Sequence, residues 1–378
     1  MNLKKILFLS GHAHLGLDPT AEGASGGAEL QVALLAKELV QRGKEVVLLA
    51  ADTGQGDALT QQGIRVRNGG RFDTGTLWDT LRALPRIVSI LREEKPDVVA
   101  VYGWTSWLYL LANLRAWARY RLLFVCALDS EIDGGFRKTH PWRGSLFQKG
   151  MERCDIRLAI TEDQVALFRA QGMSCDVMRL LLQEKFSPNR VIDVKNKSID
   201  LLWVARCNRV KQPMLFLDLA AQFPQARCRM ICSNQDEELW QAVKRRALTM
   251  PHVEFLEKVP YRDIQSHFDQ ARIFVNTSSD EGVPNTFIHA GLGSTAIASL
   301  KVDPDHMFHH FQAGCCAHGD FQLLVEKTRA LLANQENLFL AQHQANRFVR
   351  EWHDNKKNVE IFLESLQPSA SSPRSILS

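Results

Sequence analysis

The stretch that decides the fold is 279–290, which reads Ser-Asp-Glu-Gly-Val-Pro-Asn-Thr-Phe-Ile-His-Ala. It lies between two apolar runs, 273–275 and 295–298, so we expect a strand, an acidic loop, a helix and a second strand. Pro284 suits the first turn of that helix, because the N–H that proline lacks would have no partner there. In open parallel sheets, ligands bind beyond the carboxyl ends of the strands, where a helix N-terminus offers backbone N–H groups. The stretch therefore predicts a ligand site in an α/β fold.

Two carboxylates, Asp280 and Glu281, stand directly before the expected helix. A helix N-terminus favours phosphate groups, whereas a carboxylate accepts hydrogen bonds from hydroxyl groups. A ligand that carries both hydroxyls and phosphate would suit this corner, and a sugar nucleotide meets that description.

Length and composition indicate a globular protein of two domains. The chain has 378 residues, of which 45% are hydrophobic and 23% are charged. This length is enough for two domains of about 150–200 residues, each with its own core. The formal net charge of +4 is small and argues against a dedicated nucleic-acid-binding protein.

The cysteines and the apolar runs predict a cytoplasmic protein. No Cys-x-x-Cys pair occurs, so a reducing compartment is the simpler interpretation. The segment 2–10 is too short for a secretory signal, and the longest uncharged run, 98–114, fits a strand, a turn and a helix better than a membrane span. One mixed cluster of potential metal ligands comprises His306, His309, His310, Cys315, Cys316 and His318. Its spacing matches no standard zinc module, so we expect no metal.

Short β-rich runs alternate with amphipathic stretches in both halves of the chain. The strands expected in the first half are 6–9, 45–49, 98–102, 122–126 and 156–160. Those expected in the second half are 199–204, 229–232, 253–255, 273–275 and 295–298. Alternating strands and helices predict a parallel, doubly wound sheet in each half.

The alternation weakens only once, and this sets the expected boundaries. We predict an N-terminal Rossmann-like domain (1–182), a polar linker (183–198), a C-terminal Rossmann-like domain (199–345), a C-terminal helix (346–366) and a disordered Ser/Pro-rich tail (367–378).

Two glycines, Gly26 and Gly27, precede the first long amphipathic stretch. Glycine lets the backbone approach a ligand closely, and a helix N-terminus favours negative charge. Glycines that merely end a loop are the alternative. The Gly-x-Gly-x-x-Gly spacing of a dinucleotide site is lacking here.

Two cations, Arg206 and Lys211, follow the first strand of the second half. There they could neutralise a diphosphate without a metal, because Arg offers a planar fork of donors and Lys a compact charge. Solvated charges on a loop are the alternative.

These three segments resemble the signatures of the retaining glycosyltransferases of the GT-B fold, family 4 (glycosyl transferases group 1). The family motif Glu-Gly-[Phe/Val]-Pro-Asn-x-x-x-Glu-Ala is matched from Glu281 to Asn285. The family pattern Gly-Arg-x-x-x-x-Lys keeps Arg206 and Lys211, with Ala205 in place of the glycine. Gly26 opens a Gly-Gly-Ala-Glu segment, which is a common start of the first long helix in that family.

The resemblance implies two doubly wound Rossmann-like domains facing across a cleft, with the C-terminal helix crossing back to the N-terminal domain. It also implies a nucleotide-diphosphate sugar as co-substrate, with no metal or other cofactor. The residues that it implies for catalysis are Arg206, Lys211 and Glu281. The residues that it implies for donor binding are Gly26, Gly27, Gly282, Val283, Pro284, Asn285, Thr286 and His289.

The chain departs from the family at two positions. His289 stands where a glutamate normally binds both ribose hydroxyls, and a histidine can make only one such bond. A packed histidine without a ligand is the alternative. Leu128 stands where the histidine of a His-Asp pair is expected. The candidates for binding acceptor hydroxyls are His12, Asp129, Glu131 and Asp133, and a solvated surface position is the alternative for each.

A basic, aromatic stretch of the first half comprises Arg137, Lys138, His140, Trp142, Arg143 and Lys149. It suits the headgroups of anionic lipids or a pyrophosphate-linked acceptor. A solvated face is the alternative.

Our hypothesis is a cytoplasmic glycosyltransferase (EC 2.4) that moves a sugar from a nucleotide-diphosphate sugar to an acceptor hydroxyl with retention of configuration. The expected partners are the nucleotide sugar, a saccharide or lipid-linked saccharide acceptor and the inner face of the plasma membrane, with no nucleic acid, in bacterial polysaccharide or glycolipid assembly. Two alternatives remain. One is a nucleotide-sugar epimerase of the same fold. The other is a degenerate, non-catalytic protein that binds a glycan or a protein partner, and His289 and Leu128 favour it.

Overall fold

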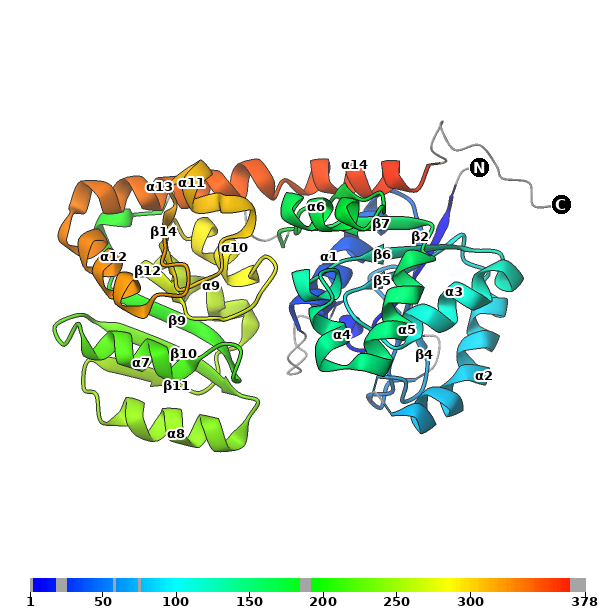
Figure 1. Cartoon of the computed structure of the whole chain (residues 1–378), viewed down its shortest axis with the longest axis horizontal. Helices are drawn as coiled ribbons and strands as arrows, with labels where there is room; N and C mark the ends of the chain where they lie inside the picture. The colour runs from blue at the N-terminus through cyan, green and yellow to red at the C-terminus, as the bar shows by residue number, and fades with distance from the viewer. Residues whose placement is uncertain (1–2, 18–25, 57–58, 74–75, 184–191, 368–378) are drawn as a thin grey trace. The chain divides into compact units, whose positions relative to one another are not determined.

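The computed structural model describes residues 3–17, 26–56, 59–73, 76–183 and 192–367 (Figure 1). These residues form two α/β units. Unit 1 comprises the described residues of Met1–Leu181 and Asn355–Ser378, and unit 2 comprises those of Leu182–Asp354. Two Rossmann-like domains, as predicted, make up the chain. The predicted tail from 368 onward lies outside the described residues.

Unit 1 is built on an eight-stranded sheet with the strand order β3-β4-β2-β1-β5-β6-β7-β8. Its strands are β1 (Lys5–Leu9), β2 (Glu45–Ala50), β3 (Leu59–Gln61), β4 (Ile64–Asn68), β5 (Val98–Tyr102), β6 (Arg121–Val125), β7 (Ile156–Ala159) and β8 (Asp176–Val177). Only the pairing of β3 with β4 is antiparallel among the described strands. Because the other strands are parallel, their carboxyl ends lie at one edge of the sheet, which we call the carboxyl edge of unit 1.

Successive side chains of β1 point to opposite faces of this sheet, and different helices cover the two faces. The helices of unit 1 are α1 (Gly27–Gln41), α2 (Leu77–Glu94), α3 (Trp107–Ala118), α4 (Gly135–Thr139), α5 (Pro141–Glu152), α6 (Glu162–Ala170) and α14 (Asn355–Ser365). Leu7 packs in one core cluster with residues of α2, α3 and α5. Phe8, its neighbour in β1, stacks on Phe362 of α14, with ring centroids 6.3 Å apart. The sheet is thus buried on both sides.

The segment 346–366 does not form the single helix that the sequence predicts. A helix of unit 2, α13 (Gln335–Trp352), ends there, and α14 begins after a short break and belongs to unit 1. Within unit 1, Asn355 Nδ2 donates to Glu38 Oε1 (2.9 Å), and the Arg179 backbone N–H donates to Asn358 Oδ1 (2.9 Å). Amphipathic periodicity could not show the break, because both helices carry an apolar stripe.

Unit 2 contains a six-stranded, wholly parallel sheet with the strand order β11-β10-β9-β12-β13-β14. Its strands are β9 (Ile199–Cys207), β10 (Cys228–Asn234), β11 (Val253–Leu256), β12 (Ala271–Asn276), β13 (Ala296–Ser299) and β14 (Gly314–Cys316). Its other helices are α7 (Pro213–Ala221), α8 (Glu237–Leu248), α9 (Ile264–Asp269), α10 (Asn285–Leu292), α11 (Met307–Phe311) and α12 (Phe321–Ala333). The strand order reverses between β9 and β12, which places the ligand-binding position of such sheets at their carboxyl ends.

The end of the predicted linker 183–198 is an ordered anchor of unit 2. Lys197 is 6% exposed, and its ammonium donates to the carbonyl oxygens of Gly293 (2.8 Å) and Asp269 (3.0 Å). These carbonyls lie at the ends of α10 and α9, where helices leave C=O groups unpaired. Lys197 therefore fixes the C-terminal end of α10, the helix that the Ser279–Ala290 stretch predicts.

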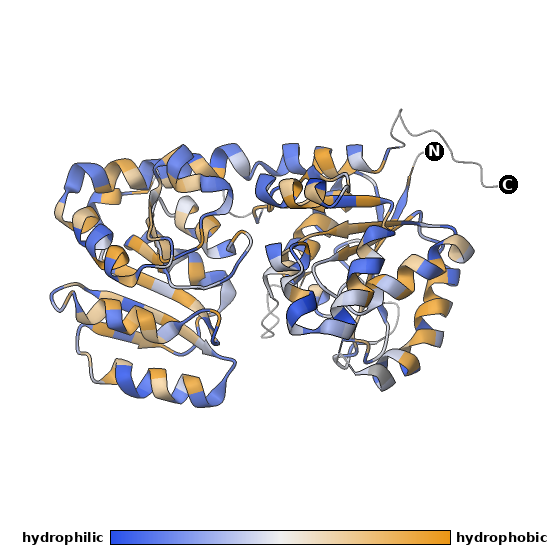
Figure 2. Cartoon of the chain, viewed as in Figure 1, coloured by the Kyte–Doolittle hydropathy of each residue, from blue (hydrophilic) through white to orange (hydrophobic). Residues whose placement is uncertain are grey.

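Hydrophobic residues follow the strands of both units, and the helices carry both hydrophobic and hydrophilic residues (Figure 2). In the described part of the chain, no helix combines the length and the apolar character that crossing a bilayer requires.

Candidate functional site

The loops that follow β9 and β12 are bound together at the carboxyl edge of unit 2. Thr277 Oγ1 lies 2.8 Å from the carbonyl oxygen of Lys211, to which it donates, and it accepts a hydrogen bond from Trp203 Nε1 (2.9 Å). The Ser279 backbone N–H donates to the carbonyl oxygen of Val210 (2.9 Å). Because Thr277 is fully buried, this connection is shielded from water. It brings together the two segments that the sequence analysis singled out independently.

Lys211 and Glu281 form an ion pair across these loops. Lys211 Nζ lies 2.5 Å from Glu281 Oε2, and both side chains are largely but not wholly buried. The other carboxylate oxygen, Glu281 Oε1, accepts from Asn276 Nδ2 (3.1 Å). Both oxygens of Glu281 are therefore bonded, one to a cation and one to an amide. Asn276 was not among the predicted site residues, although its place as the last residue of β12 is a signal that could have indicated it.

Arg206 lies at the same edge of the sheet. It lies near the end of β9, in register with Ser233 of β10, and it is exposed. Within the described residues, its guanidinium makes no ion pair with a carboxylate. A guanidinium in this position has its full charge and its donors available to an anion.

The N-terminus of α10 opens beside Glu281. The sequence predicts Pro284 in the first turn of the helix, but Pro284 is the residue directly before α10. No side chain caps the helix there. The residues next to this end in the chain are Gly282, Val283, Asn285 and Thr286. A helix of this length carries a partial positive charge at its start. The carboxyl edge of unit 2 therefore holds the Lys211–Glu281 pair, a helix N-terminus and, near the end of β9, the exposed Arg206.

His289 lies inside the protein rather than at this edge. It is 6% exposed, its Nδ1 lies 2.7 Å from Gln265 Oε1, and its Nε2 lies 3.1 Å from Tyr261 Oη. Its ring also stacks on Phe268. Both ring nitrogens therefore have protein partners, as in the alternative of a packed histidine, and the bond of His289 to a ribose hydroxyl stays a prediction.

In unit 1, Gly26 and Gly27 open α1 at the carboxyl edge. Gly26 is the residue before the helix, and no side chain caps it. The loop that precedes it, 18–25, lies outside the described residues. A second helix N-terminus without a side-chain cap is thus present, as the Gly-Gly-Ala-Glu segment predicts.

His12 pairs with a residue that the sequence analysis missed. Its Nε2 lies 2.8 Å from Asp73 Oδ2, in a loop after β4, and both side chains are partly exposed. Nothing in the sequence connects these two residues, which lie 61 positions apart. A partly exposed His-Asp pair can accept and donate hydrogen bonds to an acceptor hydroxyl.

The three carboxylates after β6 differ in burial, and Glu131 is the buried one. Glu131 is 6% exposed and accepts from the backbone N–H groups of Trp104 (2.8 Å) and Ala127 (2.8 Å). Burial raises its pKa to about 7, although these hydrogen bonds act in the opposite direction. These bonds hold the loops after β5 and β6 together, and the contact of Glu131 with an acceptor stays a prediction.

The two neighbouring aspartates also have local partners. Asp129 Oδ1 accepts from Gln164 Nε2 (3.0 Å), and Asp133 Oδ1 accepts from the Gly135 backbone N–H at the start of α4 (2.7 Å). Asp133 remains exposed, so a ligand can still reach its carboxylate.

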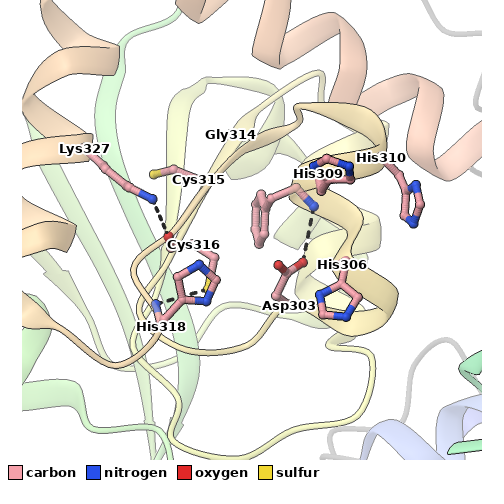
Figure 3. A pocket seen from close by; sticks show the side chains of 10 residues that line it. Asp303, His306, His309, His310, Gly314, Cys315, Cys316, His318 and Lys327 are labelled. Atoms are coloured by element: carbon pink, nitrogen blue, oxygen red, sulfur yellow. Dashed lines mark hydrogen bonds between the residues drawn. The ribbon is translucent and has the colours of Figure 1, made fainter. Parts of the chain in front are cut away.

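The His/Cys cluster lines a separate cavity of unit 2 of about 630 Å³ (Figure 3). Asp303 Oδ1 accepts from the Phe308 backbone N–H (3.2 Å), and Lys327 Nζ donates to the carbonyl oxygen of Cys316 (2.7 Å). No group of three or more His, Cys, Asp or Glu side chains among the described residues is arranged to hold a metal ion.

Models of known protein families match both units of the chain. The model of a glycosyl transferase 4-like domain matches residues 26–181, and the model of glycosyl transferases group 1 matches residues 198–334. The chain belongs to the GT-B glycosyltransferases. The second match includes the loops after β9 and β12, and the first includes Gly26 and the carboxylates after β6.

Solved structures with low sequence identity share the fold along the whole chain. Sucrose-phosphate synthase from Thermosynechococcus elongatus is 15% identical and has a TM-score of 0.77, with 96% of this chain and 98% of that chain covered. Anabaena HepE, solved in complex with UDP, is 15% identical with a TM-score of 0.70, over 96% and 99% of the two chains. A Listeria monocytogenes protein described as a UDP-N-acetylglucosamine 2-epimerase is 14% identical with a TM-score of 0.61, over 95% and 94%. None of the curated proteins searched matches the chain by sequence.

Proposed function

We propose that this GT-B glycosyltransferase moves a sugar from a nucleotide-diphosphate sugar to an acceptor hydroxyl with retention of configuration. The observation that carries the proposal is the Lys211–Glu281 ion pair beside the N-terminus of α10, at the same edge of the sheet as Arg206 near the end of β9. Two cations and a helix N-terminus suit a diphosphate, and a carboxylate beside them suits the sugar hydroxyls. HepE, which has the same fold, was solved with UDP.

In the proposed reaction, the bond between the sugar anomeric carbon and the diphosphate oxygen breaks, and the acceptor oxygen bonds to that carbon on the same face. The acceptor proton passes to the departing diphosphate. Arg206 and Lys211 stabilise the negative charge that develops on this leaving group, and such electrostatic stabilisation is usually the largest contribution to catalysis. Because these cations lie next to the leaving group, we propose that no metal or other cofactor is required.

We propose that the acceptor is a saccharide or lipid-linked saccharide, handled at the inner membrane surface in bacterial polysaccharide or glycolipid assembly. The basic, aromatic stretch supports this. It forms α4, α5 and the residue between them, with Arg137, Lys138, Arg143 and Lys149 against the single carboxylate of Glu152. Trp142 is 65% exposed, and an exposed Trp beside basic side chains is typical of contact with anionic headgroups.

The proposal is tested by incubating the protein with UDP-, GDP-, ADP- and CMP-sugars and candidate acceptors, with and without EDTA. We expect a glycoside whose anomeric configuration, measured by proton NMR, equals that of the donor, and an unchanged rate in EDTA. An inverted product would refute retention, and loss of activity in EDTA would refute metal independence.

Two other functions have specific support. The engagement of both His289 ring nitrogens favours a non-catalytic protein that binds a glycan or protein partner, and in that case no nucleoside diphosphate raises the melting temperature. The fold shared with the Listeria epimerase favours a nucleotide-sugar epimerase, and in that case an epimer forms without any acceptor.

A further inference from the structure

The ion pair at the candidate site joins two groups that the proposed reaction uses separately. Lys211 is assigned to the diphosphate and Glu281 to the sugar, yet Nζ of the one lies 2.5 Å from Oε2 of the other. An ammonium that is bound to a carboxylate presents less charge to a phosphate. A carboxylate oxygen that is bound to an ammonium is a weaker acceptor for a hydroxyl. In this arrangement the ion pair weakens the binding of phosphate by Lys211 and the binding of a hydroxyl by Glu281.

We propose that the diphosphate of the donor takes Lys211 from Glu281, and that this exchange releases Oε2 to accept a hydrogen bond from a sugar hydroxyl. The inference rests on the proposed function and concerns how the same site is regulated. Binding of the diphosphate and recognition of the sugar are then coupled, because the first event creates the acceptor that the second one needs.

The surroundings of Lys211 allow its ammonium to move while its backbone stays in place. The Lys211 backbone N–H donates to Asn208 Oδ1 (2.9 Å), and its carbonyl oxygen accepts from Thr277 Oγ1 (2.8 Å). The side chain is 22% exposed, and four flexible methylene groups carry the ammonium. Breaking the pair costs energy because both side chains are largely buried, but a diphosphate offers two negative charges where Glu281 offers one. The ammonium therefore gains a stronger partner when the donor binds.

Asn276 keeps Glu281 in place when Lys211 leaves. Its Nδ2 donates to Glu281 Oε1 (3.1 Å), and its own Oδ1 accepts from the Ser278 backbone N–H (3.1 Å). Asn276 is 5% exposed, so these bonds are protected from water. The carboxylate thus keeps one fixed bond while its other oxygen changes partner.

An unusual consequence follows for variants. Glu281→Gln removes the competitor for Lys211, so it should raise the affinity for a free nucleoside diphosphate while lowering turnover. We expect a gain of about fivefold, which corresponds to about 1 kcal/mol. Simple repulsion between Glu281 and the diphosphate would also give a gain, but that gain would not depend on Lys211.

A double-mutant cycle separates the two explanations. Calorimetric titration with UDP, GDP and ADP identifies the ligand of the wild-type protein. The same ligand is then titrated into Glu281→Gln, Lys211→Met and the double variant. The matched control is Glu351→Gln, which removes the carboxylate of the Arg347–Glu351 pair on α13. We expect the fivefold gain in Glu281→Gln, no gain in Glu351→Gln and, in the Lys211→Met background, no further effect of Glu281→Gln.

The possible outcomes are distinct. A gain that disappears with Lys211→Met supports the exchange. An unchanged or reduced affinity in Glu281→Gln overturns it, as does a gain of the same size in both backgrounds, and either result leaves the proposed transfer reaction standing. If the wild-type protein and every variant bind none of the nucleotides, the donor site itself is absent and the proposed function falls with the exchange.

Discussion

The carboxyl edges of the two units use their charged residues in different ways. In unit 2, Lys211 and Glu281 pair with each other in partial contact with solvent, and Arg206 is exposed. In unit 1, Glu131 is buried and bonded to the backbone of two loops. Both edges belong to the same kind of sheet, and both carry acidic loops. A carboxylate in such a loop can serve a ligand only where its bonds can be exchanged, and burial decides this.

The largest expected effect tests the edge of unit 2. Arg206→Ala should lower turnover by about a hundredfold or more, because it removes a cation from the leaving diphosphate without disturbing a packed group. The measurement is kcat with the preferred donor, together with circular dichroism to confirm folding. Arg245→Ala, on the exposed face of α8, is the matched control and should keep full turnover. Normal turnover in Arg206→Ala would contradict the proposal that this edge of unit 2 binds the donor diphosphate.

The burial of Glu131 at the edge of unit 1 predicts that the free energy of unfolding depends on pH. Its folded-state pKa of about 7 lies above the usual 4.5, so the folded protein holds a proton that the unfolded chain loses between these values. This contribution to stability is fully present below pH 4.5 and is lost as the pH rises through 7. It amounts to about 3 kcal/mol at most for a shift of this size.

The measurement for Glu131 is the urea unfolding free energy of wild type and Glu131→Gln from pH 4.5 to 8. We expect the difference between the two proteins to change across this range by up to that amount, in favour of the variant at high pH. Glu152→Gln, at an exposed carboxylate of α5, should show no such change. A Glu131→Gln curve parallel to that of wild type would contradict the raised pKa.

His289 tests whether a residue of the donor-site motif has become structural. His289→Ala removes the partner of the buried Gln265 Oε1, and an unsatisfied buried polar group costs about 1–3 kcal/mol, whereas the exposed Tyr261 can bond to water instead. We expect a loss of stability of about 2 kcal/mol and less than a twofold change in nucleoside diphosphate affinity. Thermal unfolding and calorimetric titration on the same sample provide both values. A large loss of nucleoside diphosphate affinity with little loss of thermal stability would indicate that His289 binds the ligand directly.

The smallest effect concerns the helices next to the edge of unit 1. Arg137→Gln should reduce binding to vesicles that contain anionic lipid about fivefold, since each basic residue near such a surface contributes about 1 kcal/mol. Sedimentation with phosphatidylglycerol vesicles measures this, and phosphatidylcholine vesicles should bind neither protein. Arg245→Gln in unit 2 is the control. Equal loss in both variants would indicate unspecific attraction to charge.

Much of the fold could be predicted from the sequence, because its signals are local. Apolar runs such as 273–275 and 295–298 became β12 and β13 within one or two residues. The break between α13 and α14 escaped prediction, since both sides of it share the same helical periodicity. Lys197 was assigned to a linker because its anchoring partners, Asp269 and Gly293, lie far along the chain.

For the candidate site, the sequence alone determined which residue types gather at the strand ends, because strand, loop and helix signals lie within a few residues of Arg206 and Glu281. The tertiary structure alone decided what these residues do. Pairing Lys211 with Glu281, His12 with Asp73 and His289 with Tyr261 requires segments that are distant in sequence to lie within about 3 Å. The burial of Glu131 likewise depends on loops from two strands. Such contacts depend on packing, which no local pattern encodes.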